Sequence, residues 1–233
     1  MSRWETWEIA GHTLEYNDES HLYICDGIIV PSVTTLLKRR FSKKYADVPE
    51  FVLKRAAWLG TTLHGAIENA EKSGDAESYI LTETEGAIKD EFSGYLSLKN
   101  QYGFTVEGNE MPLVIPYKGE IIAAGRMDLL LMNRDGQLGV ADIKRTAKLD
   151  EIYLSYQLTL YGRGVKYCYN VDPEFYRCVW LRKKEKAYRA IRPCEAQVDR
   201  LLEEVWNENQ SEIDIPYGGI GDEPDMLCGE GQG

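Results

Sequence analysis

Two aspartates and a lysine stand at spacings that suit metal-assisted chemistry. Asp128, Asp142 and Lys144 lie in two apolar runs, and the residues at 133–137 between the runs favour a turn. If the hairpin centres on Asp135, Asp128 and Asp142 are cross-strand neighbours with Cβ atoms roughly 5 Å apart. Lys144 comes two residues after Asp142, so its side chain projects from the same face of the strand.

Two facing carboxylates inside an apolar sheet are costly unless a cation or a proton neutralises them. Mg²⁺ or Mn²⁺ is the natural partner because hard divalent cations prefer oxygen ligands, and the carbonyl of Ile143 could turn toward the site. A nearby lysine can position a water or stabilise charge on a phosphate, so the hairpin suits metal-assisted phosphodiester hydrolysis. The plainer alternative is a solvated Asp-x-Lys pair at a strand end.

Two predicted helices carry further polar side chains at helical spacing. His64 lies within the first, and Glu68 follows one turn later on the same face. A neutral imidazole can ligate a metal ion, and a glutamate can orient it. Tyr153, Gln157 and Tyr161 recur at every fourth position of the second helix, where they could contact phosphates or stack on bases. Lone helical histidines and half-buried tyrosines are also common as structural residues.

These residues need a scaffold of helices and strands to bring them together. Apolar and polar residues alternate over 7–31, with breaks at glycine and aspartate, which predicts a small β meander. A short helix should follow Pro31, and longer helices are predicted over 49–71, 83–101, 152–169 and 195–207. Strands are predicted over 104–115, 120–132, 138–145, 174–182 and 187–192. This order predicts an α/β fold with a central mixed sheet flanked by helices.

The charge is distributed unevenly along the chain. A formal net charge of −11 argues against a nucleic-acid partner when taken alone, because phosphate binding needs a positive surface. However, residues 201–233 hold nine of the 38 acidic residues and no lysine or arginine. A basic cluster at 38–44 includes Arg39, Arg40 and Lys43, which we predict to contact DNA. We expect an N-terminal meander with this basic segment (1–48), a core (49–210) and an acidic, flexible tail (211–233).

The remaining composition excludes other classes of protein. The five cysteines are widely spaced and form no Cys-x-x-Cys pair, so we expect neither a disulfide framework nor an iron–sulfur cluster. No apolar run reaches the roughly 18 residues that span a bilayer, and the first residues lack an apolar signal segment. We therefore expect a cytoplasmic protein without membrane association, located in the bacterial host if a phage encodes it.

Taken together, these motifs resemble the PD-(D/E)xK nuclease superfamily, and in particular its RecB-like exonuclease branch. The matching pieces are the helical His64, Gly125-x-x-Asp128, Asp142-Ile143-Lys144 and Gln157-x-x-x-Tyr161, which occur in the family's order. The segment at 31–35 is similar to the start of phage and mitochondrial single-domain members. The resemblance covers roughly residues 20–192 and implies a restriction-endonuclease-like core.

The resemblance also implies roles for individual residues. His64, Asp128, Asp142 and the carbonyl of Ile143 would ligate Mg²⁺ or Mn²⁺, and Lys144 would be the catalytic lysine. Gln157 and Tyr161 would contact DNA. Further candidates at the edge of the site are Glu68, Tyr153 and Glu110, the last on the strand where some relatives place an acidic residue.

The implied activity is that of a DNA exonuclease. It would use one or two metal ions to hydrolyse phosphodiester bonds from DNA ends or in single strands, during recombination, repair or DNA degradation. The sequence has no helicase P-loop motif, so unwinding would need a partner such as a helicase, a single-strand-binding protein or a recombination protein. Two alternatives stay open: a structure-specific endonuclease of the same superfamily, and a catalytically inactive DNA-binding or interaction protein on a nuclease scaffold.

Overall fold

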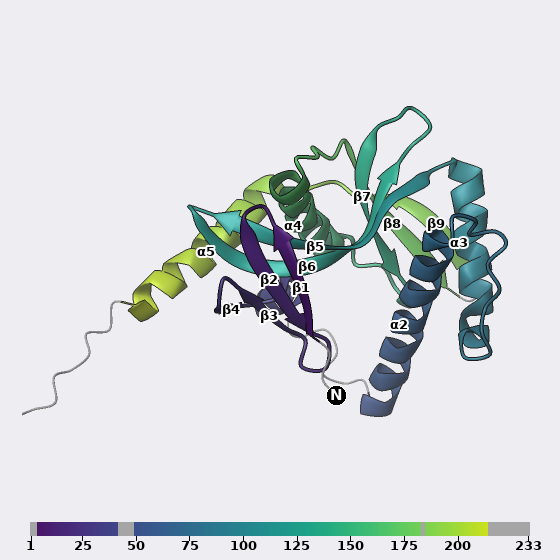
Figure 1. Ribbon diagram of the computed structural model, residues 1–233, viewed down its shortest axis with the longest axis horizontal. Helices are drawn as coiled ribbons and strands as arrows, with labels where there is room; N and C mark the ends of the chain where they lie inside the picture. The colour runs from purple at the N-terminus through teal and green to yellow at the C-terminus, as the bar shows by residue number, and fades with distance from the viewer. Residues whose placement is uncertain (1–3, 42–48, 183–184, 214–233) are drawn as a thin grey trace, which may run out of the picture.

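The N-terminal strands form a four-stranded antiparallel sheet in sequential order (Figure 1). The computed structural model describes residues 4–41, 49–182 and 185–213, with 211–213 as backbone only. The strands are β1 (Trp4–Ile9), β2 (His12–Asn17), β3 (Leu22–Cys25) and β4 (Ile28–Val30). The turns at 10–11 and 26–27 have positive φ at both residues, as type I′ hairpin turns require. The predicted meander is confirmed, and it begins earlier than residue 7.

The central sheet has five strands in the order β5-β6-β7-β8-β9. They are β5 (Thr105–Tyr117), β6 (Glu120–Met132), β7 (Leu138–Lys144), β8 (Phe175–Arg182) and β9 (Glu185–Ala190). All neighbouring strands pair antiparallel except β7 and β8, which are parallel. A parallel pair needs a crossover connection, and α4 (Glu151–Tyr169) provides it. The sheet is therefore mixed, as predicted.

Four more helices surround this sheet. They are α1 (Val33–Phe41), α2 (Glu50–Lys72), α3 (Lys89–Tyr102), which follows a 3₁₀ turn at Glu85–Ile88, and α5 (Glu195–Ile213). The predicted helix at 83–101 is thus divided into a 3₁₀ turn and α3. The helix α5 runs past residue 210, where we predicted the core to end, so that boundary was placed too early. The acidic tail from residue 214 lies outside the described residues.

Apolar side chains on both faces of β6 and β7 explain why helices cover the sheet on two sides. Leu129 and Leu131 pack in one cluster with Leu63 of α2 and Tyr95 of α3. Leu130, between them, packs in the opposite cluster with residues of α1, α4 and α5. This alternation is the period of two that a β-strand imposes. The two helical layers are visible in Figure 1 on either side of the sheet.

The N-terminal sheet packs against the end of the central sheet that is closed by the β5–β6 hairpin. Its buried residues share a cluster with Val114 and Ala124 of these two strands. Ser32, just after β4, forms an isolated parallel bridge with Ala124, whose amide donates to the carbonyl of Pro31 at 3.0 Å. This bridge fixes the N-terminal sheet beside β6, and the candidate site residues of β6 follow four positions later.

Candidate metal centre

The β6–β7 hairpin has the register that its turn sequence predicts. The side chain of Asn133 accepts hydrogen bonds from the amides of Asp135 and Gln137, at 3.0 and 2.9 Å. The strand pairing runs from Met132 opposite Leu138 to Leu129 opposite Ala141. The next positions in this register are 128 and 142, which are symmetric about Asp135. The predicted register of the hairpin is therefore confirmed as far as Leu129 and Ala141, one position before the two aspartates.

Beyond Leu129 the two strands separate, and the side chain of Asp128 fills the fork between them. Its Oδ2 accepts a hydrogen bond of 2.7 Å from the amide of Ile143. The carboxylate thus accepts a hydrogen bond that a backbone carbonyl of β6 would accept if the β6–β7 pairing continued. Because Asp128 is buried, this bond holds its carboxylate in a fixed orientation, with the second oxygen directed elsewhere. Burial raises the pKa of Asp128, against the lowering effect of His64.

Glu110 brings a third carboxylate into the same row. On β5, Asn109 lies opposite Leu129 and Met111 opposite Met127, so Glu110 falls opposite Asp128. Its φ of 47° is in the left-handed region, which is uncommon for a residue other than glycine. Such conformations concentrate at functional sites. Glu110, Asp128 and Asp142 therefore occupy neighbouring positions across three adjacent strands.

His64 of α2 reaches this row from the helical layer. Its Nδ1 lies 3.4 Å from Glu110 Oε1 and 3.7 Å from Asp128 Oδ1. Its Nε2 lies 3.2 Å from the carbonyl oxygen of Ile143. Burial lowers the pKa of His64, but the Asp128 and Glu110 carboxylates outweigh that effect and raise it to about 9. The imidazole therefore joins the backbone of β7 to the carboxylates of β5 and β6.

Asp142 and Lys144 form the other half of the site. Lys144 Nζ lies 2.6 Å from Asp142 Oδ2, which confirms that the two side chains share a face. Asp142 is 0% exposed, and its Oδ1 has no hydrogen-bond partner among the described residues. Burial raises the pKa of Asp142 to about 6, although Lys144 acts in the opposite direction. One buried carboxylate oxygen is therefore left without a compensating group.

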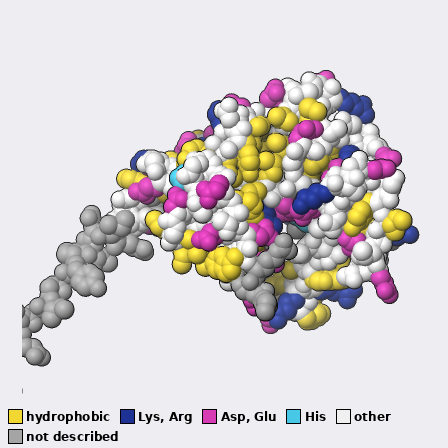
Figure 2. All heavy atoms as spheres, viewed as in Figure 1, with side chains coloured by type: hydrophobic (Ala, Val, Ile, Leu, Met, Phe, Trp, Pro, Cys, Tyr) yellow, Lys and Arg dark blue, Asp and Glu magenta, His cyan; other side chains and the backbone are white. Residues whose placement is uncertain are grey.

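This donor set fits a hard divalent cation. One ligand atom each from His64, Glu110 and Asp128 lies within 4.8 Å of the others. Carboxylate and carbonyl oxygens with one imidazole suit Mg²⁺ or Mn²⁺ better than a soft metal, which would favour thiolates. The unpaired Oδ1 of Asp142 supplies a further oxygen that burial makes costly without a cation. Figure 2 shows acidic and basic side chains meeting in a hollow between the N-terminal sheet and α2.

Of the predicted outer residues, Glu68 lies differently from expectation, whereas Tyr153 lies near Lys144. Glu68 does not orient His64: it forms an ion pair with Lys72 at 2.5 Å, one turn further along α2. That prediction was wrong, because Lys72 stands at the same i, i+4 spacing from Glu68, while His64 Nδ1 faces the carboxylates of Glu110 and Asp128. Tyr153 packs against Phe41 with ring centroids 5.4 Å apart and is close enough to Lys144 to influence its charge.

Gln157 and Tyr161 of α4 are buried next to each other. They are 3% and 4% exposed, and Gln157 Nε2 donates to the Tyr161 hydroxyl at 3.2 Å. Burial raises the pKa of Tyr161, and the charges of Asp128 and Asp142 raise it further. Both side chains are thus near the carboxylates. Their predicted contact with DNA stays a prediction, since in this conformation little of either side chain reaches the surface.

The predicted basic cluster is engaged in contacts within the protein. Arg39 pairs with Glu208 of α5 at 2.5 Å. The guanidinium of Arg40 lies 5.7 Å from the centre of the Tyr156 ring. Lys43 lies outside the described residues. Arg126, which we did not predict, stands two positions before Asp128, and this spacing could have indicated a shared face of the strand.

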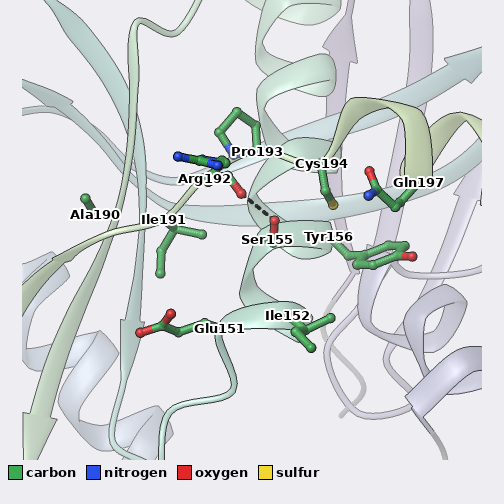
Figure 3. A pocket seen from close by; sticks show the side chains of 10 residues that line it. All are labelled: Glu151, Ile152, Ser155, Tyr156, Ala190, Ile191, Arg192, Pro193, Cys194 and Gln197. Carbon is green, nitrogen blue, oxygen red and sulfur yellow. Dashed lines mark hydrogen bonds between the residues drawn. The ribbon is translucent and has the colours of Figure 1, made fainter.

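A separate pocket of about 480 Å³ lies between the start of α4 and the segment that leads into α5 (Figure 3). The hydroxyl of Ser155 donates to the carbonyl of Arg192 at its edge. Tyr156 and Ile191 contribute apolar walls. None of the residues that we predicted to bind metal lines this pocket, so it is distinct from the carboxylate site.

No family model and no curated protein matches this chain. Among solved structures, the crystal structure of a protein called SSO0001 shares 18% sequence identity, covers 76% of this chain and 84% of its own, and has a TM-score of 0.35. Within the described residues, no helix is long and apolar enough to cross a membrane.

Proposed function

We propose that this chain is a divalent-metal-dependent deoxyribonuclease of the PD-(D/E)xK type, which acts on DNA ends or single strands. One observation carries the proposal: buried Asp128 and Asp142 lie one position beyond the last paired residues of β6 and β7, with His64 beside Asp128 and Lys144 beside Asp142. A structural role alone would not explain two charged carboxylates placed in an apolar sheet.

The residues that would hold a metal ion are His64, Glu110, Asp128, Asp142 and the carbonyl of Ile143. When bound there, Mg²⁺ or Mn²⁺ would supply a Lewis acid for the phosphate and lower the pKa of a water molecule. Within the chain, the Ile143 amide fixes the Asp128 carboxylate, and Asp142 holds the Lys144 ammonium at 2.6 Å. An ammonium so positioned can donate a hydrogen bond to a phosphate oxygen and stabilise the charge that develops during cleavage.

The test is cleavage of end-labelled single-stranded and double-stranded DNA with Mg²⁺, with Mn²⁺ and with EDTA. We expect cleavage that needs the metal and falls by about 100-fold or more in Asp142→Ala and Lys144→Ala, the size of loss typical for a group that stabilises the transition state. Asp135→Asn is the matched control, because it changes an exposed aspartate at the turn of the same hairpin. Equal cleavage by wild type and both site variants would refute the proposal.

A covalently closed circular substrate separates the two modes of cleavage. An exonuclease leaves the circle intact, whereas an endonuclease of the same superfamily opens it. Calorimetric titration with Mn²⁺ tests the remaining alternative, an inactive interaction protein, because a degenerate site would bind little metal and the wild type would then match Asp142→Ala.

A further inference from the structure

Arg126 is a charged residue of β6 for which the proposed metal site gives no role. It lies two positions before Asp128, which corresponds to a separation of about 6.6 Å along a strand. Its Nη2 forms an ion pair of 2.8 Å with Glu5 of β1. It therefore connects the strand of the metal site with the first strand of the N-terminal sheet.

Two aromatic rings of the N-terminal sheet hold the guanidinium in place. The Arg126 Cζ atom lies 5.4 Å from the centre of the Trp7 ring and 4.9 Å from that of Tyr16. Contacts of this kind fix a planar guanidinium while leaving its N–H edge available. The N-terminal sheet thus orients the guanidinium of Arg126, whereas the backbone of Arg126 belongs to the central sheet.

The hydrogen-bonding capacity of Arg126 is incompletely used. Its Nε is buried and has no hydrogen-bond partner among the described residues. By contrast, Arg163 of α4 pairs with two carboxylates, Glu195 and Asp199, at 2.7 and 2.8 Å. A guanidinium has five N–H donors in a fixed fork that fits a carboxylate or a phosphate. Arg126 therefore has N–H donors beyond its bond to Glu5, and its side chain is 24% exposed.

The charge of Arg126 acts on the same surroundings as that of Glu110. Burial raises the pKa of Tyr16 and of Tyr23, and in both cases Arg126 lowers it while Glu110 raises it. The guanidinium and the outermost carboxylate of the site are therefore both close to these two tyrosines.

We propose that Arg126 binds a DNA phosphate next to the one at the carboxylates, and that Glu5 holds the guanidinium until the phosphate replaces it. This inference rests on the proposed nuclease function. A two-residue step along β6 separates Arg126 from Asp128, so the two side chains can serve successive phosphates of one strand. The N-terminal sheet then acts as a wall of the DNA site that presents the arginine.

The test is fluorescence anisotropy with labelled single-stranded DNA in calcium chloride, repeated over a range of KCl, with a gel to check that the DNA stays intact. Loss of one phosphate contact should reduce the slope of log affinity against log salt by about 0.7. We expect that reduction in Arg126→Gln, with about a tenfold loss of affinity at low salt. Arg126→Lys should keep the slope but bind more weakly, because lysine lacks the fork.

The Glu5→Gln variant distinguishes this proposal from a purely structural role of the Arg126–Glu5 ion pair. If Arg126 only ties the two sheets together, Glu5→Gln should weaken DNA binding as Arg126→Gln does. If Glu5 only holds the guanidinium until a phosphate replaces it, Glu5→Gln should bind DNA as well as wild type or better. The variant lacks the carboxylate that competes with the phosphate. Arg134→Gln is the control, since Arg134 is exposed at the hairpin turn and donates to carbonyls of residues 100 and 101.

The possible results distinguish a failure of the Arg126 proposal from a failure of the nuclease proposal. An unchanged salt slope in Arg126→Gln, or equal weakening in Glu5→Gln, overturns the role of Arg126 even when wild type cleaves DNA. If wild type neither cleaves nor binds DNA, the nuclease proposal fails and this inference fails with it. If Arg126→Gln does not fold, as judged by its melting curve, Arg126→Lys and Glu5→Gln still give the deciding comparison.

Discussion

Replacing Lys144 with methionine should destabilise the metal-free protein and make its stability depend on divalent cations. In wild type the ammonium lies 2.6 Å from Asp142, whose side chain is 1% exposed. Removing one partner of a buried ion pair costs about 3–5 kcal/mol, because the other charge is left without compensation. We expect the lower end of this range, about 3 kcal/mol, because the lysine side chain is 22% exposed and Asp142 can take up a proton.

Thermal melting with and without Mn²⁺ measures both effects. For a chain of this length, about 3 kcal/mol corresponds to a fall of roughly 6–12 °C in Tm. Mn²⁺ should restore much of that loss, because a ligand that binds only the folded state stabilises it and here would replace the missing positive charge. The gain on adding Mn²⁺ should therefore be larger in Lys144→Met than in wild type.

The chain offers a closely matched control. Lys99 of α3 lies 2.6 Å from Glu71 of α2, with the two side chains 23% and 10% exposed. Lys99→Met should lower Tm to a similar degree, but Mn²⁺ should not restore it, because a single carboxylate with a tyrosine partner is no site for a divalent cation. If Mn²⁺ has the same effect on both variants, the carboxylates of β6 and β7 do not form a metal site.

Three further predictions test the outer site, the packing and the pH dependence. Glu110→Gln should weaken Mn²⁺ binding about tenfold in calorimetry, whereas Glu68→Gln should leave it unchanged; a loss in both variants would contradict the geometry. In urea titrations Gly65→Ala should stabilise by about 1 kcal/mol, because no atom lies within 4 Å of an added Cβ. Gly162→Ala should destabilise by about 1–3 kcal/mol, since its Cβ would lie 2.6 Å from the Tyr176 hydroxyl; the same sign for both would refute this. Burial raises the pKa of Glu85, but hydrogen bonds from Thr82 and Tyr79 outweigh it and lower the pKa below 4.5. A lowered pKa stabilises the fold above the unfolded value and loses that effect as pH falls, so Glu85→Gln should cost about 1 kcal/mol at neutral pH and progressively less in acid.

The hairpin that carries the site was predictable because two independent signals agree. The turn residues around Asp135 fix the register, and the apolar residues on both faces of each strand require cover on both sides. Together they place Asp128 opposite Asp142 without any knowledge of the rest of the chain. The alternation of helices and strands then leaves few arrangements of the central sheet, and the predicted order of elements is the observed one.

Other parts of the site depend on tertiary structure that sequence spacing does not encode. Glu110 lies 3.4 Å from His64 with its backbone in the left-handed region, a conformation that sequence spacing does not predict. Helical spacing identified the face that carries Gln157 and Tyr161, but not how deeply the sheet would bury that face. For Glu68 the spacing was ambiguous, because His64 and Lys72 are both one turn away, and the structure pairs Glu68 with Lys72.

The electrostatics of the site bear on why an acidic chain could still act on DNA. A metal-bound His64 is neutral, so three carboxylates and the Lys144 ammonium would then leave two net negative charges, which a single divalent cation would cancel. Without that cation the row of carboxylates repels a phosphate, so we expect metal to bind before DNA engages the fork. Arg126 lies outside this row, on the side of the N-terminal sheet, and needs no metal to attract a phosphate. If the chain binds DNA as proposed, its whole-chain charge is a poor guide to that binding, because attraction would depend on these few groups and on the cation they would hold.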